Sequence, residues 1–195
     1  MSTENRESFL INVMNKGFSR AALSFSQMIQ KPVSVVNSQS LLIRHDDFSY
    51  IAEAPGDFFI LSTQIIGDIS GKSFLIFSSE ESSEIFKTLN SSISNDALKE
   101  AFLLEIDNII SASVIAELSN SLGLEIYGDV PRLTKIHSKA LESLMIQELN
   151  NEEPSSVIFC NTTFQLDAKE RVHPQFIWKL SNRLFEMIPV EKTTF

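Results

Sequence analysis

The sequence predicts an α+β fold in which two long helices pack on a mostly antiparallel sheet, with a pseudo-twofold duplicated unit. Two stretches, 1–30 and 96–122, place apolar residues at the three- and four-residue spacing of amphipathic helices. Short runs rich in β-branched and aromatic residues, which are typical of strands, follow each of them. Residues 13–26 and 106–119 also share an asparagine and a similar hydrophobic pattern. Because the strand runs are adjacent in sequence, we expect antiparallel pairing.

The first half predicts a long helix, a series of strands and a shorter helix. Pro32 ends the first helix, because proline lacks a backbone N–H and disfavours the helical conformation of Lys31. Ser78 and Glu81 have the spacing of a capping box, which predicts a helix over about 79–90. The strands expected between these helices are 33–38, 41–44, 48–54, 58–66 and 72–77.

The second half repeats a shortened form of this order after the polar, turn-rich stretch 90–96. Gly123 is well placed to end the second long helix. Pro131 suits the first position of a helix, which we expect over 131–149. The inner face of that helix would hold Leu133, Ile136, Leu141, Leu144 and Met145. The remaining predictions are strands over 122–128, 155–167 and 175–181 and a closing helix over 182–187.

Composition indicates one globular domain over 1–195, with halves of about 1–90 and 96–195. The chain has one cysteine, which excludes a disulfide framework within it and favours a reducing compartment. No apolar run is long enough to span a membrane, and the polar first residues do not resemble a secretory signal. A net charge of −9 without a basic block argues against nucleic acid and anionic membranes as partners. We therefore expect a cytoplasmic protein.

Several potential catalytic or ligand-binding motifs fail on spacing or context. The segment 67–73 (GDISGKS) has three residues between its glycines where a phosphate-binding loop needs four, and a strand follows it. A hairpin turn explains these glycines better. His45, His137 and His173 are scattered without metal-ligand spacing. Cys160 lies in the middle of a predicted strand and is expected to be a core residue.

Glu105 and Asn108 are the polar pair that remains. Residues three apart on a helix differ by about 60° in direction and by roughly 4.5 Å along the axis. Both side chains should therefore project from one edge of the second long helix, beside its apolar stripe. The same spacing is also typical of an ordinary solvated helix surface.

The segment 102–110 (FLLEIDNII) resembles the phosphatase helix of the CheC/CheX/FliY family. The opening segment 11–17 (INVMNKG) resembles the first copy of that helix, and the predicted 67–71 hairpin is similar to the family's sheet between the helices. The resemblance implies a protein that dephosphorylates CheY-type response regulators. It further implies that Glu105 pairs with the partner's active-site lysine and that Asn108 orients the attacking water. It implies no cofactor of the chain's own, with Mg²⁺ arriving on the partner.

The sequence departs from the family pattern in both copies. In the first copy, Ser8 and Asn15 match, but Asn12 replaces the glutamate, so we expect this site to be weak or inactive. In the second copy, Ala101 replaces an aspartate or serine, and Asp107 lies where the family commonly has glycine. These departures favour a chain with a single site.

Other functions and partners stay open at the level of sequence. The main alternative is a non-catalytic module that binds a response regulator or a chemotaxis or flagellar-motor protein. A sensor domain for a small ligand is a further alternative, which would need a deep apolar pocket. By resemblance, a CheD-like protein could also bind, and an exposed edge strand could extend the sheet across a homodimer.

Overall fold

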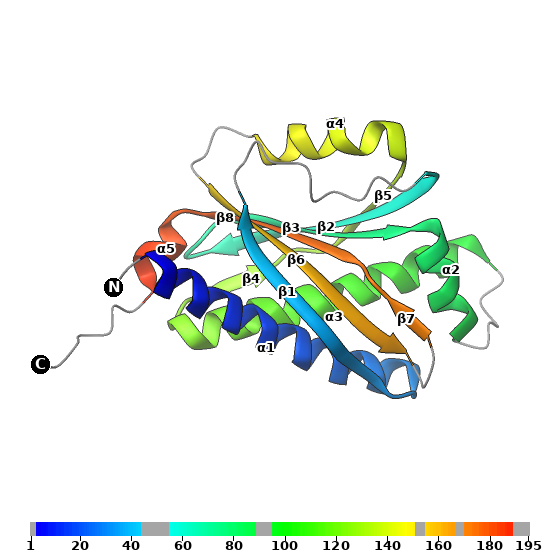
Figure 1. The fold of residues 1–195 in the computed structure, drawn as a ribbon, viewed down its shortest axis with the longest axis horizontal. Coiled ribbons are helices and arrows are strands. Elements are labelled where there is room, and N and C mark those ends of the chain that lie inside the picture. The colour runs from blue at the N-terminus through cyan, green and yellow to red at the C-terminus, as the bar shows by residue number, and fades with distance from the viewer. Residues whose placement is uncertain (1–2, 44–54, 89–94, 151–154, 167–169, 189–195) are drawn as a thin grey trace, which may run out of the picture.

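The computed structural model describes residues 3–43, 55–88, 95–150, 155–166 and 170–188. Helices and strands alternate along the described chain in an α+β arrangement, as predicted (Figure 1). The helices are α1 (Thr3–Ile29), α2 (Ser79–Thr88), α3 (Asp96–Leu122), α4 (Ser138–Leu149) and α5 (Arg183–Met187). The strands are β1 (Val33–Ile43), β2 (Asp57–Gly67), β3 (Gly71–Ser78), β4 (Ile126–Gly128), β5 (Arg132–His137), β6 (Ser155–Leu166), β7 (Glu170–Val172) and β8 (Gln175–Ser181).

All eight described strands form one antiparallel sheet, and its order reveals the pseudo-twofold unit. The path runs β1-β6-β8-β3-β2-β4, with β5 beside β4 on the outer edge of β2 and β7 on β6. Strand β1 of the first half pairs with β6 of the second, while β4 and β5 of the second half pair with β2 of the first. Strands β3 and β8 meet in the centre. Each half thus supplies the outer strand of the other, which agrees with the predicted duplicated unit.

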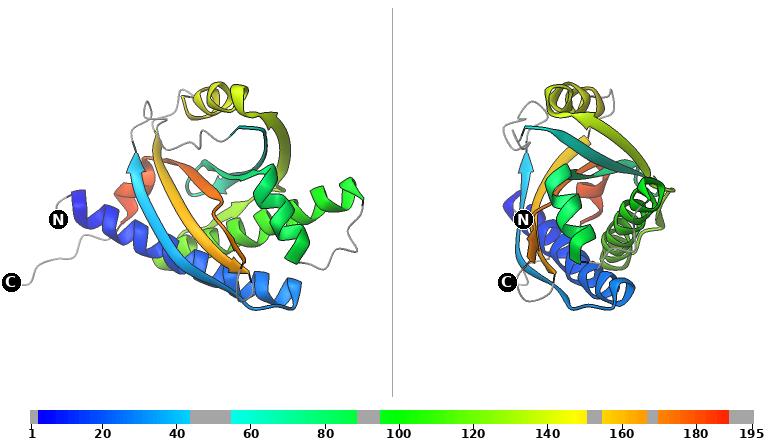
Figure 2. Two further views of the ribbon diagram at one scale, coloured as in Figure 1. Left: turned by 45° about the vertical axis from the view of Figure 1, so that its right-hand side comes forward. Right: turned by 90° about the vertical axis from the view of Figure 1, so that its right-hand side faces the viewer.

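Helices cover both faces of the sheet. The long helices α1 and α3 lie together on one face, and α4 lies on the opposite face (Figures 1 and 2). The larger apolar core lies between the sheet and the α1/α3 layer, and the smaller one joins α4 to the sheet. The strands alternate between these cores: Leu61 and Ile65 of β2 belong to the first, and Phe58 and Ile60 belong to the second. Two-sided burial explains the continuously apolar runs of β3 and β8.

The expected helix ends are present. Ser78 and Glu81 form the capping box: the Ser78 amide donates to Glu81 Oε2 at 2.9 Å and the Glu81 amide donates to Ser78 Oγ at 3.1 Å. Gly123 ends α3 in the left-handed conformation, with φ of 66°. The segment between Gly67 and Gly71 is a β2–β3 turn, and Gly67 has φ of 119°, which favours glycine. The prediction of a hairpin there is confirmed.

The predicted helix over 131–149 is wrong in its first part. Residues Arg132–His137 form strand β5, which pairs with the outer edge of β2, and α4 begins at Ser138. Leu133 packs in the core beneath α3, and Ile136 packs beside α4 on the other face, which is the alternation of a strand. The apolar spacing of 133 and 136 fits a helix locally, but the free hydrogen-bonding edge of β2 decides in favour of a strand.

Other differences concern strand limits. Residues 33–43 form one continuous strand rather than two, and β4 is shorter than expected. Strand β7 has no counterpart among the predicted strands, and the expected strand over 48–54 lies outside the described residues. Over the described residues, no helix combines the length and the apolar character needed to cross a lipid bilayer.

Candidate functional site

Helix α3 carries the candidate pair on its solvent side. The side chain of Asn95 accepts a hydrogen bond from the Ala97 amide and begins the helix. The opposite side of α3 is buried against the sheet and α1, so the direction of the solvent-exposed side is fixed. Glu105 and Asn108 are both exposed on that side, together with Ala101. The pair is therefore neither buried nor directed to different sides of the helix.

The two side chains border one shallow hollow between α3 and the turn that joins β4 to β5. Its volume is about 370 Å³. Its lining residues are Ala101, Leu104, Glu105, Asn108, Gly128, Asp129, Val130 and Pro131. Val130 is 77% exposed, so the lining combines this apolar side chain with the polar side chains of Glu105 and Asn108 on α3 and of Asp129 in the turn. An acid and an amide at an open, partly apolar surface can reach into another protein, but they do not enclose a small substrate.

The corresponding residues of the first half are arranged differently. Ser8 and Asn12 are exposed on α1, whereas Asn15 is half-buried and accepts hydrogen bonds from Ser38 Oγ at 2.9 Å and Ser40 Oγ at 3.5 Å. The oxygen of Asn15 is thus engaged by β1. Asn12 and Asn15 line a different hollow, of about 760 Å³, between α1 and α3. An Arg20–Glu117 ion pair of 2.7 Å lies in its lining.

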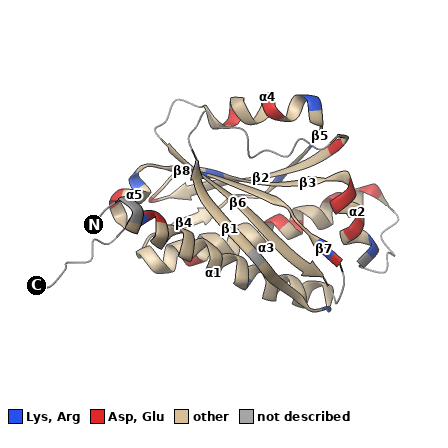
Figure 3. Cartoon of the chain, viewed as in Figure 1, with Lys and Arg blue, Asp and Glu red and all other residues tan. Residues whose placement is uncertain are grey.

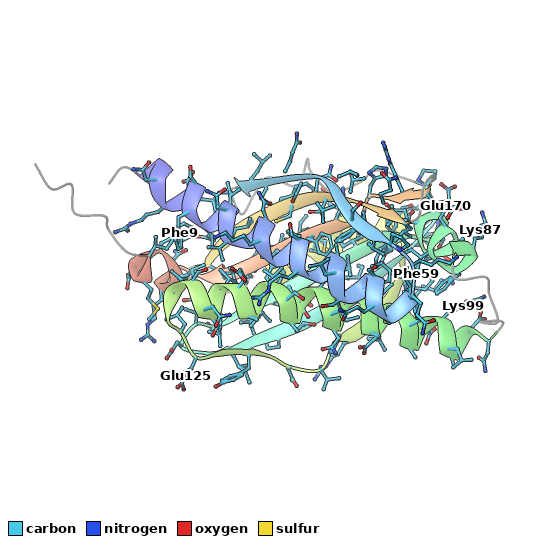
Figure 4. The ribbon with its side chains drawn as sticks, turned by 90° about the horizontal axis from the view of Figure 1, so that it is seen from below. Phe9, Phe59, Lys87, Lys99, Glu125 and Glu170 are labelled. Atoms are coloured by element: carbon cyan, nitrogen blue, oxygen red, sulfur yellow. The ribbon has the colours of Figure 1, made fainter. Side chains whose placement is uncertain are left out.

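The two long helices run side by side in opposite directions (Figure 4). They approach closely at Gly17, where an added Cβ would lie 2.7 Å from Val114 Cα. This close crossing fixes the position of α3 on the sheet and so the position of the candidate pair.

A buried carboxyl group lies on the inner side of the same helix. Asp107 is 2% exposed, and Thr63 Oγ1 of β2 donates a hydrogen bond of 2.7 Å to its Oδ2. Burial raises the pKa of Asp107 to about 7, while the hydrogen bond from Thr63 lowers it. In the sequence, Asp107 stands out only as a departure from the family pattern. Its place between Leu103 and Ile110 on the apolar stripe is the signal that could have predicted its burial.

Other candidate residues lie elsewhere. Cys160 is fully buried, and burial raises the pKa of its thiol to about 12, so it is a core residue as expected. His137 caps α4, and His173 shares a 2.9 Å hydrogen bond with Thr163, while His45 lies outside the described residues. Within the described ranges, no group of three or more metal-ligating side chains comes together.

Comparison with solved structures identifies proteins of the same fold. No family model matches the sequence. The chain is similar to FliY from Thermotoga maritima, with a TM-score of 0.68, 14% identity, and coverage of 95% of this chain and 94% of that chain. It is also similar to a chain of the FliG–FliM complex from H. pylori, with a TM-score of 0.60, 12% identity, and coverage of 95% of this chain and 100% of that chain.

A third similar structure is the CheX–CheY–BeF3–Mg²⁺ complex from Borrelia burgdorferi, with a TM-score of 0.51, 14% identity, and coverage of 88% and 99%. The similarity extends over most of each chain, so the whole architecture is shared. The chain has the CheC-like fold, and the resemblance to the CheC/CheX/FliY family is confirmed at the level of the fold.

Proposed function

We propose that the chain is a member of the CheC/CheX/FliY family that accelerates hydrolysis of the phospho-aspartate of a CheY-type response regulator. Glu105 and Asn108 on α3 form the site. The observation that carries the proposal is that both side chains are exposed on one side of α3 and border one hollow. The similarity to CheX, which one solved structure contains in complex with CheY, supports the choice of partner.

The arrangement suits a reaction that needs positioning more than a nucleophile. An acyl phosphate is already reactive, and phosphoryl transfer is accelerated by orienting water and stabilising charge. Asn108 offers both a donor and an acceptor, so its amide can hold a water molecule in line with the phosphorus atom. Glu105 has an exposed carboxylate that can pair with a lysine beside the partner's phosphoryl group. Mg²⁺ would be held by the partner.

The first half does not take part in this chemistry. Asn12 lacks the negative charge that would meet a lysine, and the oxygen of Asn15 is already hydrogen-bonded to Ser38. Catalysis is thus assigned to α3 alone.

The test is the rate of phosphate loss from a phosphorylated CheY-type receiver domain. We expect Asn108→Ala to reduce the acceleration by about 10²–10⁴-fold, because a positioned polar group typically contributes that much. We expect Glu105→Gln to act mainly by weakening partner binding. Asn120→Ala is the matched control, since it removes an exposed asparagine from the same helix at a distance from the α3 pair. Equal rates for the wild type and Asn108→Ala would remove the proposal.

A second candidate function is a binding module that docks on a response regulator or a flagellar-motor protein without catalysis. Ala101, which leaves the pattern incomplete, favours it. The similarity to a FliG–FliM complex and to a FliM middle domain favours it as well. Stoichiometric binding of phosphorylated partner without faster phosphate loss would select this candidate over the phosphatase.

A further inference from the structure

The turn between β4 and β5 presents an uncovered apolar side chain beside the candidate pair. Val130 is 77% exposed, more than any other large apolar side chain described. It lines the same hollow as Glu105 and Asn108, from the side that faces α3. Isolated exposed apolar residues are common on protein surfaces, so the exposure of Val130 matters here because of the residues that share the hollow with it.

Hydrogen bonds hold the turn that carries Val130. The Asp129 amide donates to the Gln64 carbonyl of β2 at 2.8 Å, and the Val130 amide donates to Asp129 Oδ1 at 2.7 Å. Pro131 then restricts the backbone that follows. The Val130 side chain is therefore exposed on a backbone that is already ordered, so a contact with it would cost little further ordering entropy.

The hollow is closed toward the core and open toward solvent. A Cβ added to Gly128 would lie 3.0 Å from Ile115 Cδ1 and 3.1 Å from Thr63 Cγ2, so packed side chains fill the space beneath it. The remaining apolar residues of the lining are Ala101, Leu104 and Pro131. A group that reaches Asn108 through the hollow must therefore come from outside the molecule, and it then meets Val130 on the opposite side.

The charged side chains of the lining are both acidic. Glu105 belongs to α3 and Asp129 to the turn, and no ion pair between described residues engages either of them. A partner that covers this hollow must bring a positive charge, because two covered carboxylates without a cation would be costly. The receiver domain of the proposed function meets this requirement, since the group expected to pair with Glu105 is a lysine.

We propose that Val130 is a docking residue for the receiver domain, which packs an apolar area beside its phosphorylation site against Val130 while its lysine meets Glu105. The inference rests on the proposed function for the identity of the partner, and it adds a residue outside α3 to the site. An apolar contact of this kind is the same in the ground state and in the transition state, so it contributes to binding and not to the chemical step.

The test measures the dissociation constant for a CheY-type receiver domain that carries BeF3 and Mg²⁺, the form in the solved CheX–CheY complex. Val130→Ser removes most of the apolar side chain, and we expect it to raise the dissociation constant about tenfold. Val130→Ile keeps a β-branched apolar side chain and should bind like the wild type. Leu41→Ser is the matched control, because Leu41 is also exposed, at 47%, but lies on β1 at the other end of the sheet.

Turnover of the phosphorylated receiver domain provides a second readout. Val130→Ser should raise KM about tenfold and leave kcat unchanged, whereas Asn108→Ala should lower kcat. Because the Val130 side chain lies largely in solvent, Val130→Ser should unfold thermally at the temperature of the wild type.

The outcomes separate this inference from the proposed function. If Val130→Ser binds the receiver as tightly as the wild type, or if Leu41→Ser loses as much affinity, the inference is overturned and the assignment of catalysis to α3 is unaffected. If Val130→Ser alone weakens binding but the wild type does not accelerate phosphate loss, the phosphatase proposal fails while docking through Val130 stands. A wild-type chain that does not bind the receiver overturns both.

Discussion

Asp107 makes the stability of the folded chain depend on pH in the direction opposite to that of most carboxylates. Its pKa is about 7 in the folded state against an ordinary value of 3.8, because burial disfavours the charged form. Below about pH 4 the group is protonated in both states. As the pH rises from 4 to 7, the unfolded chain releases this proton and the folded chain keeps it, so unfolding becomes easier. The free energy of unfolding should fall by about 4 kcal/mol over this window and then level off.

Urea unfolding of the wild type and of Asp107→Asn at pH 5 and pH 8 measures this contribution. The asparagine does not ionise, so the variant should gain stability relative to the wild type as the pH rises. Other groups titrate alike in both proteins and cancel in the comparison. A constant difference between the two proteins across this range would show that Asp107 is already charged in the folded state.

The sequence predicts the positions of some site residues but not the hydrogen bonds of others. Helical spacing places Glu105 and Asn108 together, because neighbours on one helix need no tertiary information. The engagement of Asn15 by Ser38, and of Asp107 by Thr63, joins residues on different elements. Only the packing of α1 on β1 and of α3 on β2 brings them together, so sequence spacing could not reveal these hydrogen bonds.

At the scale of elements, the crossing of α1 and α3 depends on Gly17. Replacing glycine by alanine inside a helix usually stabilises it by about 1 kcal/mol. Here the added Cβ would lie 2.7 Å from Val114 Cα and 2.8 Å from Val114 Cγ2. Because a backbone atom of the partner helix cannot move away alone, the helices must separate, and we expect Gly17→Ala to destabilise the fold by about 1–3 kcal/mol.

Thermal unfolding of Gly17→Ala, with the exposed α1 change Gln27→Ala as a control, measures this effect. The control should stay within about 0.5 kcal/mol of the wild type. A Gly17→Ala protein as stable as the wild type would mean that the helices cross less closely than the structure places them.

The sequence predicts a helix or strand correctly where residues close in sequence determine it. It does not do so where pairing with a distant strand determines it. The capping box of α2 and the glycine end of α3 are encoded within a few residues, and both ends lie where expected. The local pattern of strand β5 predicts a helix, because its residues acquire strand geometry only from the edge of β2, which lies far earlier in the chain. The short strand β7 likewise depends on β6 and has no apolar pattern of its own.

At the scale of the whole molecule, the two ends of the sheet are protected differently. At one end, the short strands β4 and β5 pair with β2, and Asp129 and Pro131 lie in the turn between them. A charge and a proline at an edge disfavour pairing with a further strand. At the other end, β1 pairs with β6 alone among the described strands. Its eleven residues contain no charge and no proline, and Figure 3 shows β1 in tan, without the red and blue of charged residues that appear on the helices.

Such an edge is a template for another strand, and a second copy of the chain offers the same edge. We expect β1 to pair antiparallel with β1 of a second chain about a twofold axis, which joins two sheets into one. Val36 and Leu41, each 47% exposed on this strand, would gain cover in that pairing. The apparent mass measured by sedimentation equilibrium should then rise with concentration from the 21.9 kDa of one chain toward twice that value.

Val36→Lys places a charge on this edge and should keep the chain monomeric over the same concentrations. Leu23→Lys is the matched control, because Leu23 is an equally apolar, 65% exposed residue on α1 rather than on the edge strand. Association that both variants abolish alike would indicate a general apolar contact instead of strand pairing. If the wild-type chain keeps the mass of a monomer at every concentration, the expectation of β1 pairing is wrong. The backbone hydrogen bonds gained at this edge would then not offset the entropy lost on association.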